Sequence, residues 1–398
     1  MKLVNLDVAI AGAGIGGLAL ATLLARAGCR VVVYDQMDAP RPVGSGFVLQ
    51  PTGAAVLAKM GLLDKVSARG AQIMRMHGRL GDKQAGVSRT VLDVSYRKGQ
   101  SGIAIQRVAL FDVLFDAAIR AGVTVEVAAQ AQDIREGTRA SLVFKGGRVS
   151  AAADLVVDAM GANSPIQRSE DTELDYGALW ATVPWPKDGP FQTSMLEQRY
   201  DKASRMAGVL PVGTARDGAD PMATFFWSLR NRDIKQWKAA GREAWLDEVA
   251  ALWPQAAPLA AMAEPVHARY RHHTRNPIAG RGVLRIGDAW HATSPQLGQG
   301  ANMALLDAAS LVSALTRAAT LDSAVALHLQ QRQSHVRLYQ ALSLILTPFY
   351  QSDSRILPLM RDVLIGPVSK LPLMREIIST IVTGDLMDPV GRIRLSAI

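Results

Sequence analysis

The chain has 398 residues, of which 49% are hydrophobic, and this is sufficient for one large or two joined globular domains with a substantial core. Its only cysteine, Cys29, excludes an internal disulfide and favours a reducing compartment, so a cytoplasmic location is expected. The net charge of +9 attracts anions. Nucleic acid is not an expected partner, because the basic residues are not interleaved with aromatic ones in a binding module.

The first apolar segment, residues 6–25, contains Asp7 and several glycines, and no small-residue cleavage pattern follows it. A membrane span requires an uninterrupted apolar run, and a signal peptide requires a cleavage site. We therefore expect neither a targeting peptide nor an integral membrane segment.

Residues 6–11 favour a β-strand, a glycine-rich turn follows directly, and a helix through Ala27 comes next. A second apolar run, residues 30–35, ends in Asp35. This order is the context that the dinucleotide-binding fingerprint requires. The terminal acid suits the hydroxyls of an adenosine ribose and repels a 2′-phosphate, so FAD or NAD is expected rather than NADP. The residues of the turn and helix start that are expected at the cofactor are Gly12, Ala13, Gly14, Ile15, Gly16 and Gly17.

The chain then departs from the alternating strands and helices of a simple NAD dehydrogenase, which favours FAD. A strand ending at Arg107 precedes a helix over 108–121. Arg107 could hold a phosphate or the ribityl chain, or it could lie on the surface at a helix start. Short segments between 123 and 151 predict a small antiparallel excursion, and residues 154–159 predict a buried strand.

A second β-rich region, residues 174–229, holds most of the aromatic side chains. Because side chains of a strand alternate between two faces, one face is expected to pack and the other to line a pocket. Helices are expected over 231–263, 321–349 and 354–383, and the apolar stripe of the last is expected to pack on the chain's own core.

The sequence thus predicts an α/β fold, in which a Rossmann-like FAD-binding domain is interleaved with a β-sheet substrate domain and followed by C-terminal helices. The expected ranges are 1–170 and 266–320 for the FAD-binding domain, 171–265 for the substrate domain and 321–398 for the C-terminal helices.

The segment 287–302 connects a short strand to a helix that begins near Met303. Gly298 and Gly300 let a ligand approach the backbone, and the unpaired N–H groups of a helix start favour bound anionic oxygen. Asp288, directly after the strand, is placed to accept hydrogen bonds from hydroxyl groups.

Three motifs, the glycine-rich turn with Asp35, the strand and turn at 154–164 and the segment 287–302, together resemble the para-hydroxybenzoate hydroxylase family over roughly residues 4–350. Members of this family are class A FAD-dependent monooxygenases. The resemblance implies that NADPH or NADH reduces FAD and that dioxygen then forms a flavin hydroperoxide. It further implies that this species hydroxylates an aromatic or polycyclic small molecule.

The resemblance also implies roles for single residues. Arg41 and Arg107 match the family's arginines near the phosphates and the ribityl chain, and Asp288 would bind the ribityl hydroxyls. His291 matches a position that is usually structural. The residues that would cradle the pyrimidine end of the isoalloxazine, or lie beside it, are Pro295, Gly298, Gly300, Ala301 and Asn302.

The chain departs from the family pattern at Met160, which stands in place of an acid associated with FAD and pyridine-nucleotide contacts. Asp158 shares a strand face with Met160 and could substitute in part. The departure leaves open an FAD-dependent halogenase, epoxidase or reductase that relies on a partner for reduced flavin. A non-catalytic flavoprotein is the other alternative.

The expected substrate-binding residues are Gln50, Phe225, Trp227 and Pro295, with Gln50 and Pro295 nearer the flavin. No metal site is expected, and a homodimer is compatible with the long C-terminal helices. The sequence does not single out a catalytic base among Tyr200, His267, His272 and His273.

Overall fold

The computed structural model describes residues 5–39, 45–81, 89–166, 173–365 and 371–398. One half of the fold is a six-stranded sheet in the order β17-β18-β11-β1-β2-β8, parallel except for the edge strand β17. Its strands are β1 (Asp7–Ala11), β2 (Arg30–Tyr34), β8 (Thr124–Glu126), β11 (Leu155–Asp158), β17 (Ile278–Gly280) and β18 (Val283–Arg285).

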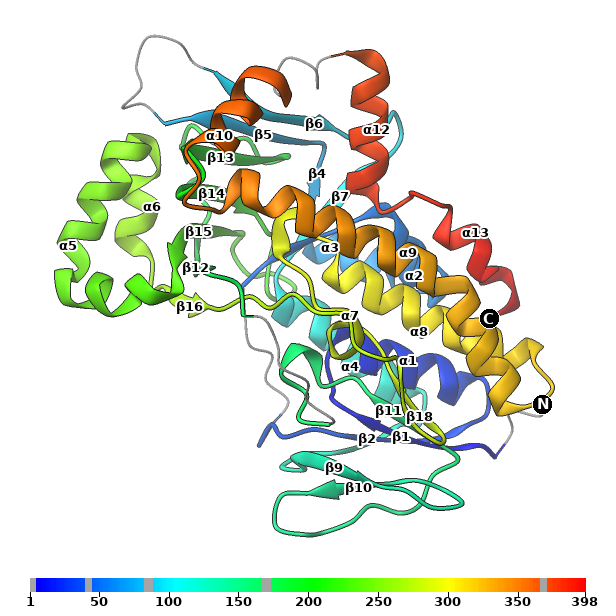
Figure 1. The fold of residues 1–398 in the computed structure, drawn as a ribbon. Helices are drawn as coiled ribbons and strands as arrows, with labels where there is room; N and C mark the ends of the chain where they lie inside the picture. The colour runs from blue at the N-terminus through cyan, green and yellow to red at the C-terminus, as the bar shows by residue number, and fades with distance from the viewer. Residues whose placement is uncertain (1–4, 40–44, 82–88, 167–172, 366–370) are drawn as a thin grey trace.

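Both faces of this sheet are covered, as its near-continuous apolar strands require. On β1, Val8 and Ile10 pack against a layer of helices, whereas Ala9 and Ala11 pack against an antiparallel pair of strands. The covering elements are α1 (Ile15–Arg26), α4 (Arg107–Arg120), α8 (Gly300–Arg317), β9 (Ala131–Arg135) and β10 (Ser141–Phe144). The expected Rossmann-like domain is thereby confirmed (Figure 1).

The second large element is a seven-stranded sheet in the order β16-β12-β15-β14-β13-β5-β6. The sequence assigned residues 171–265 to this sheet, but the structure adds β5 and β6 from residues 75–95 and β16 from beyond residue 265. The strands are β5 (Arg75–Leu80), β6 (Thr90–Ser95), β12 (Tyr176–Pro184), β13 (Met195–Asp201), β14 (Arg205–Pro211), β15 (Met222–Arg230) and β16 (Val266–Ala268). Helices α5 (Ile234–Leu252) and α6 (Ala257–Met262) cover one face.

A small three-stranded sheet and two helices are formed by chain segments on both sides of β5 and β6. The sheet has the order β3-β7-β4 and brings the extended segment before Gln50 beside the strand that ends before Arg107. Its parts are β3 (Phe47–Leu49), α2 (Pro51–Lys59), α3 (Leu63–Arg69), β4 (Ala71–Ile73) and β7 (Gly102–Ile105).

The C-terminal helices pack on the chain's own core, with α9 (Leu321–Tyr350) lying along α8 (Figure 1). The buried guanidinium of Arg361 holds the segment after α9 in place, because it lies 5.0 Å from the ring centroid of Tyr200 and 5.4 Å from that of Tyr350. The remaining helices are α10 (Ile356–Met360), a π-helical turn at Arg361–Ile365, α12 (Pro372–Thr383) and α13 (Pro389–Ile393). Within the described ranges, no helix is both long and apolar enough to cross a membrane.

Candidate cofactor and active site

The glycine-rich loop between β1 and α1 has a geometry that only glycine fits at two positions. Gly12 has a φ of +107°, and a Cβ there would lie 2.5 Å from the carbonyl oxygen of Ala159. A Cβ on Gly17 would lie 2.0 Å from the carbonyl oxygen of Gly12. Gly14, by contrast, is exposed and has open space where its Cβ would be. The loop is thus packed tightly beneath and open above, at the first turn of a helix whose N–H groups remain available for an anion.

Asp35 stands at the end of β2, where the fingerprint predicts it. One carboxylate oxygen accepts a 2.6 Å hydrogen bond from the backbone N–H of Ala13, and the other accepts a 2.9 Å bond from that of Met37. These bonds fix the carboxylate beside the glycine-rich loop, and each oxygen retains a lone pair for a ribose hydroxyl. Ile15 and Gly16 belong to the start of α1, whereas Arg41 lies outside the described residues.

Asp288 and Arg107 lie close enough for their charges to interact. Burial raises the pKa of Asp288, although the charges of His291 and Arg107 lower it. Burial likewise lowers the pKa of Arg107, and Asp288 opposes that shift. Many protein atoms surround each of the two side chains, yet each is exposed to solvent. Residues with both properties line a recess in the protein rather than its outer surface.

The segment 295–302 borders the same region. Gly298 has a φ of +61°, and a Cβ on Gly300 would lie 3.5 Å from a carboxylate oxygen of Asp288. Pro295 is exposed and Ala301 is half-buried. Buried Asn302 donates a 3.0 Å hydrogen bond to the carbonyl of Gly298. The segment therefore presents backbone at the start of α8 next to the aspartate, as the sequence predicts.

Gln50 reaches this segment from the other side. Its backbone N–H donates a 2.8 Å hydrogen bond to the side-chain oxygen of Asn302, and its own side-chain oxygen accepts a 2.7 Å bond from the hydroxyl of Tyr96. Gln50 is 1% exposed, and its side-chain Nε2 has no partner among the residues that the structure describes. This nitrogen lies 3.7 Å from the position of a Cβ on Gly298. A buried donor without a partner is a group that a ligand satisfies.

Phe225 and Trp227 do not lie at this site, and the sequence-based expectation for them is corrected. Each is 1% exposed, and both face α5 and α6 within a cluster that includes Trp245, whose ring centroid lies 6.1 Å from that of Phe225. The opposite face of β15 carries Thr224 and Phe226, and Thr224 accepts a hydrogen bond from the backbone of Gly46, just before β3. Because side chains alternate along a strand, the even-numbered residues of β15 face the cofactor domain.

A buried charged network that the sequence did not reveal supports the segment at Asp288. Fully buried Asp307 accepts hydrogen bonds from the backbone N–H of Gly287 at 2.9 Å, from His291 Nε2 at 2.7 Å and from Arg332 Nε at 2.7 Å. Burial opposes ionisation of Asp307, but the charges of His291 and Arg332 outweigh it and hold the pKa of Asp307 well below its usual range. The only sequence signal is an acid inside the apolar helix after Met303. His291 is structural, as expected.

Asp158 is not positioned to replace the missing acid at residue 160. It is fully buried and accepts hydrogen bonds from the hydroxyl of Ser164 at 2.6 Å and from the backbone N–H of Met160 at 3.1 Å. Arg285 lies 3.7 Å from its carboxylate. The carboxylate therefore stabilises the turn after β11 from its buried side.

The candidate bases differ in their surroundings. Tyr200 is fully buried, and burial raises the pKa of its hydroxyl beyond the usual range. Burial lowers the pKa of His267 and of His272, which are half-buried. His273 lies nearest the site, since its Nε2 is 3.0 Å from the backbone oxygen of Asp288.

A dinucleotide-binding sheet is combined here with a mixed second sheet, and the start of α8 lies beside the glycine-rich loop. This arrangement is typical of an FAD-dependent oxidoreductase. The family described as FAD binding domain matches residues 5–338, and the chain belongs to this family. Its cofactor is FAD, and it is an FAD-dependent monooxygenase of class A.

Individual relatives agree with this assignment. The chain is 26% identical to 3-amino-4-hydroxybenzoate 2-monooxygenase of Streptomyces cremeus, over 78% of this chain and 79% of the relative. It is 28% identical to 6-hydroxynicotinate 3-monooxygenase of Bordetella bronchiseptica, over 81% of this chain and 86% of the relative. The solved structure of 2-methyl-3-hydroxypyridine-5-carboxylic acid oxygenase in its tetrameric form superposes with a TM-score of 0.78 at 20% identity, covering 97% of this chain and 98% of that one.

Proposed function

We propose that this monooxygenase transfers one atom of dioxygen to a hydroxylated aromatic ring that is bound beside the Gly298 segment and its neighbour Gln50. The observation that carries the proposal is the buried, unpartnered Nε2 of Gln50 beside that segment. When bound, FAD supplies the activation of dioxygen, and NADPH or NADH supplies the electrons. Binding of the cofactor and orientation of the substrate are carried out by side chains and backbone of this chain.

The cofactor-binding roles follow from the geometry above. The open face at Gly14 and the first turn of α1 suit a pyrophosphate, and Asp35 suits the adenosine ribose. Asp288 and Arg107 suit the hydroxyls of the ribityl chain and a phosphate. The N-terminal end of α8 favours negative charge at Gly298 and Gly300 and thereby stabilises an anionic isoalloxazine.

Gln50 is proposed to orient the substrate. Because the hydroxyl of Tyr96 donates to the side-chain oxygen of Gln50, the amide is held with its NH₂ group toward the Gly298 segment. An NH₂ group in that place donates to an oxygen of the ligand. The names of the three relatives above each describe an aromatic ring with a hydroxyl and a carboxyl group, and we propose the same class of small hydroxylated aromatic acid here, with polycyclic aromatic compounds as the broader class.

A second candidate concerns the electron source, and the observation behind it is Met160 with the inward-facing Asp158. No carboxylate is supplied by either residue at the place where the family carries one. In this alternative a partner protein delivers reduced flavin, as the sequence left open for an epoxidase, halogenase or reductase.

Stopped-flow absorbance of the FAD-loaded protein separates the two candidates. The protein is mixed with NADPH or NADH, alone and with a panel of hydroxybenzoates, hydroxypyridine carboxylates, quinolones and polycyclic phenols. Flavin bleaching that accelerates with one compound, followed by a hydroxylated product, supports the self-sufficient hydroxylase. Flavin that stays oxidised with both nucleotides, yet yields product after chemical reduction and oxygen, refutes it and supports the partner.

A homodimer is proposed from the long C-terminal helices, and a cytoplasmic location from the single cysteine, which is buried. Sedimentation velocity of the purified protein tests the first, and fractionation of the producing cells tests the second.

A further inference from the structure

A cavity of about 520 Å³ lies at the far end of α8 from the Gly298 segment. The helix has 18 residues, so at about 1.5 Å per residue its two ends are roughly 27 Å apart. The cavity is therefore separate from the flavin site. Its volume falls within the range of roughly 300–1,000 Å³ that is usual for small-molecule sites.

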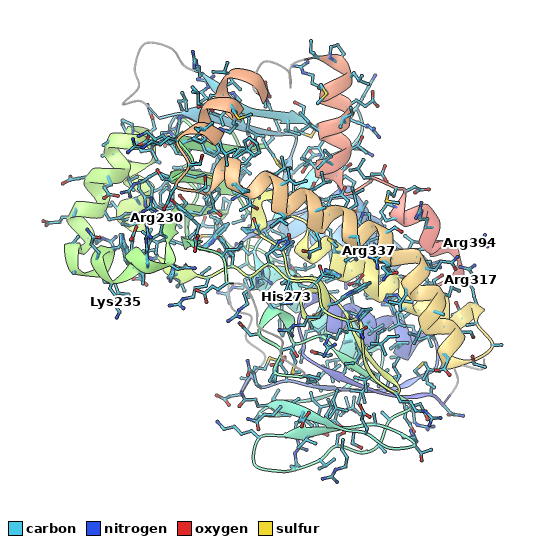
Figure 2. The ribbon with its side chains drawn as sticks, viewed as in Figure 1. Arg230, Lys235, His273, Arg317, Arg337 and Arg394 are labelled. Carbon is cyan, nitrogen blue, oxygen red and sulfur yellow. The ribbon has the colours of Figure 1, made fainter. Side chains whose placement is uncertain are left out.

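Three arginines line the cavity, and they come from two segments of the chain. Arg317 is in the last turn of α8, Arg392 is in the last turn of α13, and Arg394 follows α13. Figure 2 shows Arg317 and Arg394 at the same edge of the molecule. All three are exposed, and within the described part of the chain none forms an ion pair. The one acid of the lining, Asp388, accepts a hydrogen bond from the backbone N–H of Gly391.

Gln331 of α9 supplies an independent indication of a ligand. The residue is 6% exposed and lines the cavity. Its side-chain oxygen accepts a 2.8 Å hydrogen bond from Ser310, which fixes the orientation of the amide. Its Nε2 has no partner among the described residues. Helix ends account for cations at Arg317 and Arg392, but they do not account for a buried donor left without an acceptor.

We propose that this cavity binds a small molecule carrying a di- or polyphosphate. The three guanidinium groups of its lining are donors that match anionic oxygens, and the buried Gln331 amide lies behind them. Three arginines against one aspartate leave a net charge of +2, from 3 − 1, which exceeds the charge of one carboxylate. Separate guanidinium forks bind phosphate oxygens in pairs, so two linked phosphates satisfy more of them than one carboxylate does.

Isothermal titration of the full FAD-loaded chain with pyrophosphate, at about 0.15 M salt to screen weak surface charge, tests the proposal. Loading with FAD keeps the probe out of the flavin site. Arg317→Glu, Arg394→Glu and Gln331→Glu each weaken binding by about tenfold or more, because each places a carboxylate where a donor faces the anion. Gln331→Glu keeps an oxygen for Ser310, and its thermal midpoint shows whether the buried carboxylate leaves the fold intact.

The matched control is Arg337→Glu. Arg337 is an exposed arginine of α9 that does not line the cavity, and Figure 2 shows it farther along that helix. Arg337→Glu leaves binding unchanged although it alters the net charge as much as Arg317→Glu and Arg394→Glu do. Equal weakening in the control, or no heat of binding with the unmodified protein, overturns the proposal. ADP in a second titration shows whether a nucleoside adds to the affinity, and tighter or equal binding of ADP both support a phosphate site.

Discussion

Replacing Asp307 with asparagine removes the negative charge at the centre of the network beneath Asp288. The asparagine side chain would keep one oxygen for three donors, so Arg332 would stay buried without its countercharge. Breaking a buried ion pair from one side costs about 3–5 kcal/mol, because the remaining charge is left uncompensated. We expect a loss of that size in the free energy of unfolding, together with weaker FAD binding, because Gly287, His291 and Arg332 then compete for one acceptor oxygen.

Urea unfolding followed by tryptophan fluorescence measures the effect, since Trp290 lies 4.9 Å from the ring of His291. The matched control is Asp116→Asn, which removes an ion pair to Arg120 in which both side chains are more than half exposed. Exposed pairs contribute about 0–1 kcal/mol, so this control changes stability little. A loss below about 1 kcal/mol for Asp307→Asn would refute the view that the network holds the segment in place.

The same variant tests the pH dependence of stability. The folded-state pKa of Asp307 is depressed, so its contribution is complete above the unfolded value of about 4 and is lost as the pH falls toward the folded value. The stability curve of Asp307→Asn is therefore flatter on the acid side than that of the unmodified protein. Parallel curves down to the acid transition would contradict this assignment.

Further predictions concern the loop, the substrate and a buried histidine. Gly17→Ala destabilises the fold and lowers the amount of bound FAD, because the new Cβ would lie 2.0 Å from the carbonyl oxygen of Gly12. Gly14→Ala keeps the thermal midpoint, because space is open there, but it weakens FAD binding. Flavin absorbance and calorimetry measure both effects. Gln50→Leu raises the substrate KM about tenfold, and Tyr96→Phe does so less, in steady-state oxygen uptake; unchanged KM values would exclude the orienting role. Burial lowers the pKa of His335 to about 3, so the free energy of unfolding falls as the pH drops from about 6.5 toward that value. His335→Gln removes this contribution to acid destabilisation, and thermal unfolding at a series of pH values measures the difference.

Local patterns were sufficient for the cofactor half of the site. A strand, a glycine-rich turn and a helix are contiguous in the chain, and the roles of Gly12 and Gly17 depend on backbone approach within that unit or to the adjacent strand. Asp35 and Asp288 were predicted for the same reason, because each closely follows a strand whose carboxyl end lies at the ligand-binding side of such a sheet.

The substrate side depended on packing between distant segments. Both faces of β15 are apolar, so the alternation of its side chains does not show which face points toward the cofactor domain. Only the docking of α5 and α6 decides that Phe225 and Trp227 face away from it. Likewise, the contact between Gln50 and Asn302 joins residues 252 apart.

The sequence by itself therefore determined the dinucleotide-binding unit, since it depends on short-range backbone geometry, and the resemblance of three motifs to a known family implied FAD and the enzyme class. The tertiary structure alone decided that β5 and β6 join the substrate sheet, that Asp307 and Arg332 meet, and that three arginines surround one cavity. Each of these is a long-range pairing, and a pattern of residue types does not specify which distant partner satisfies a buried charge or an open sheet edge.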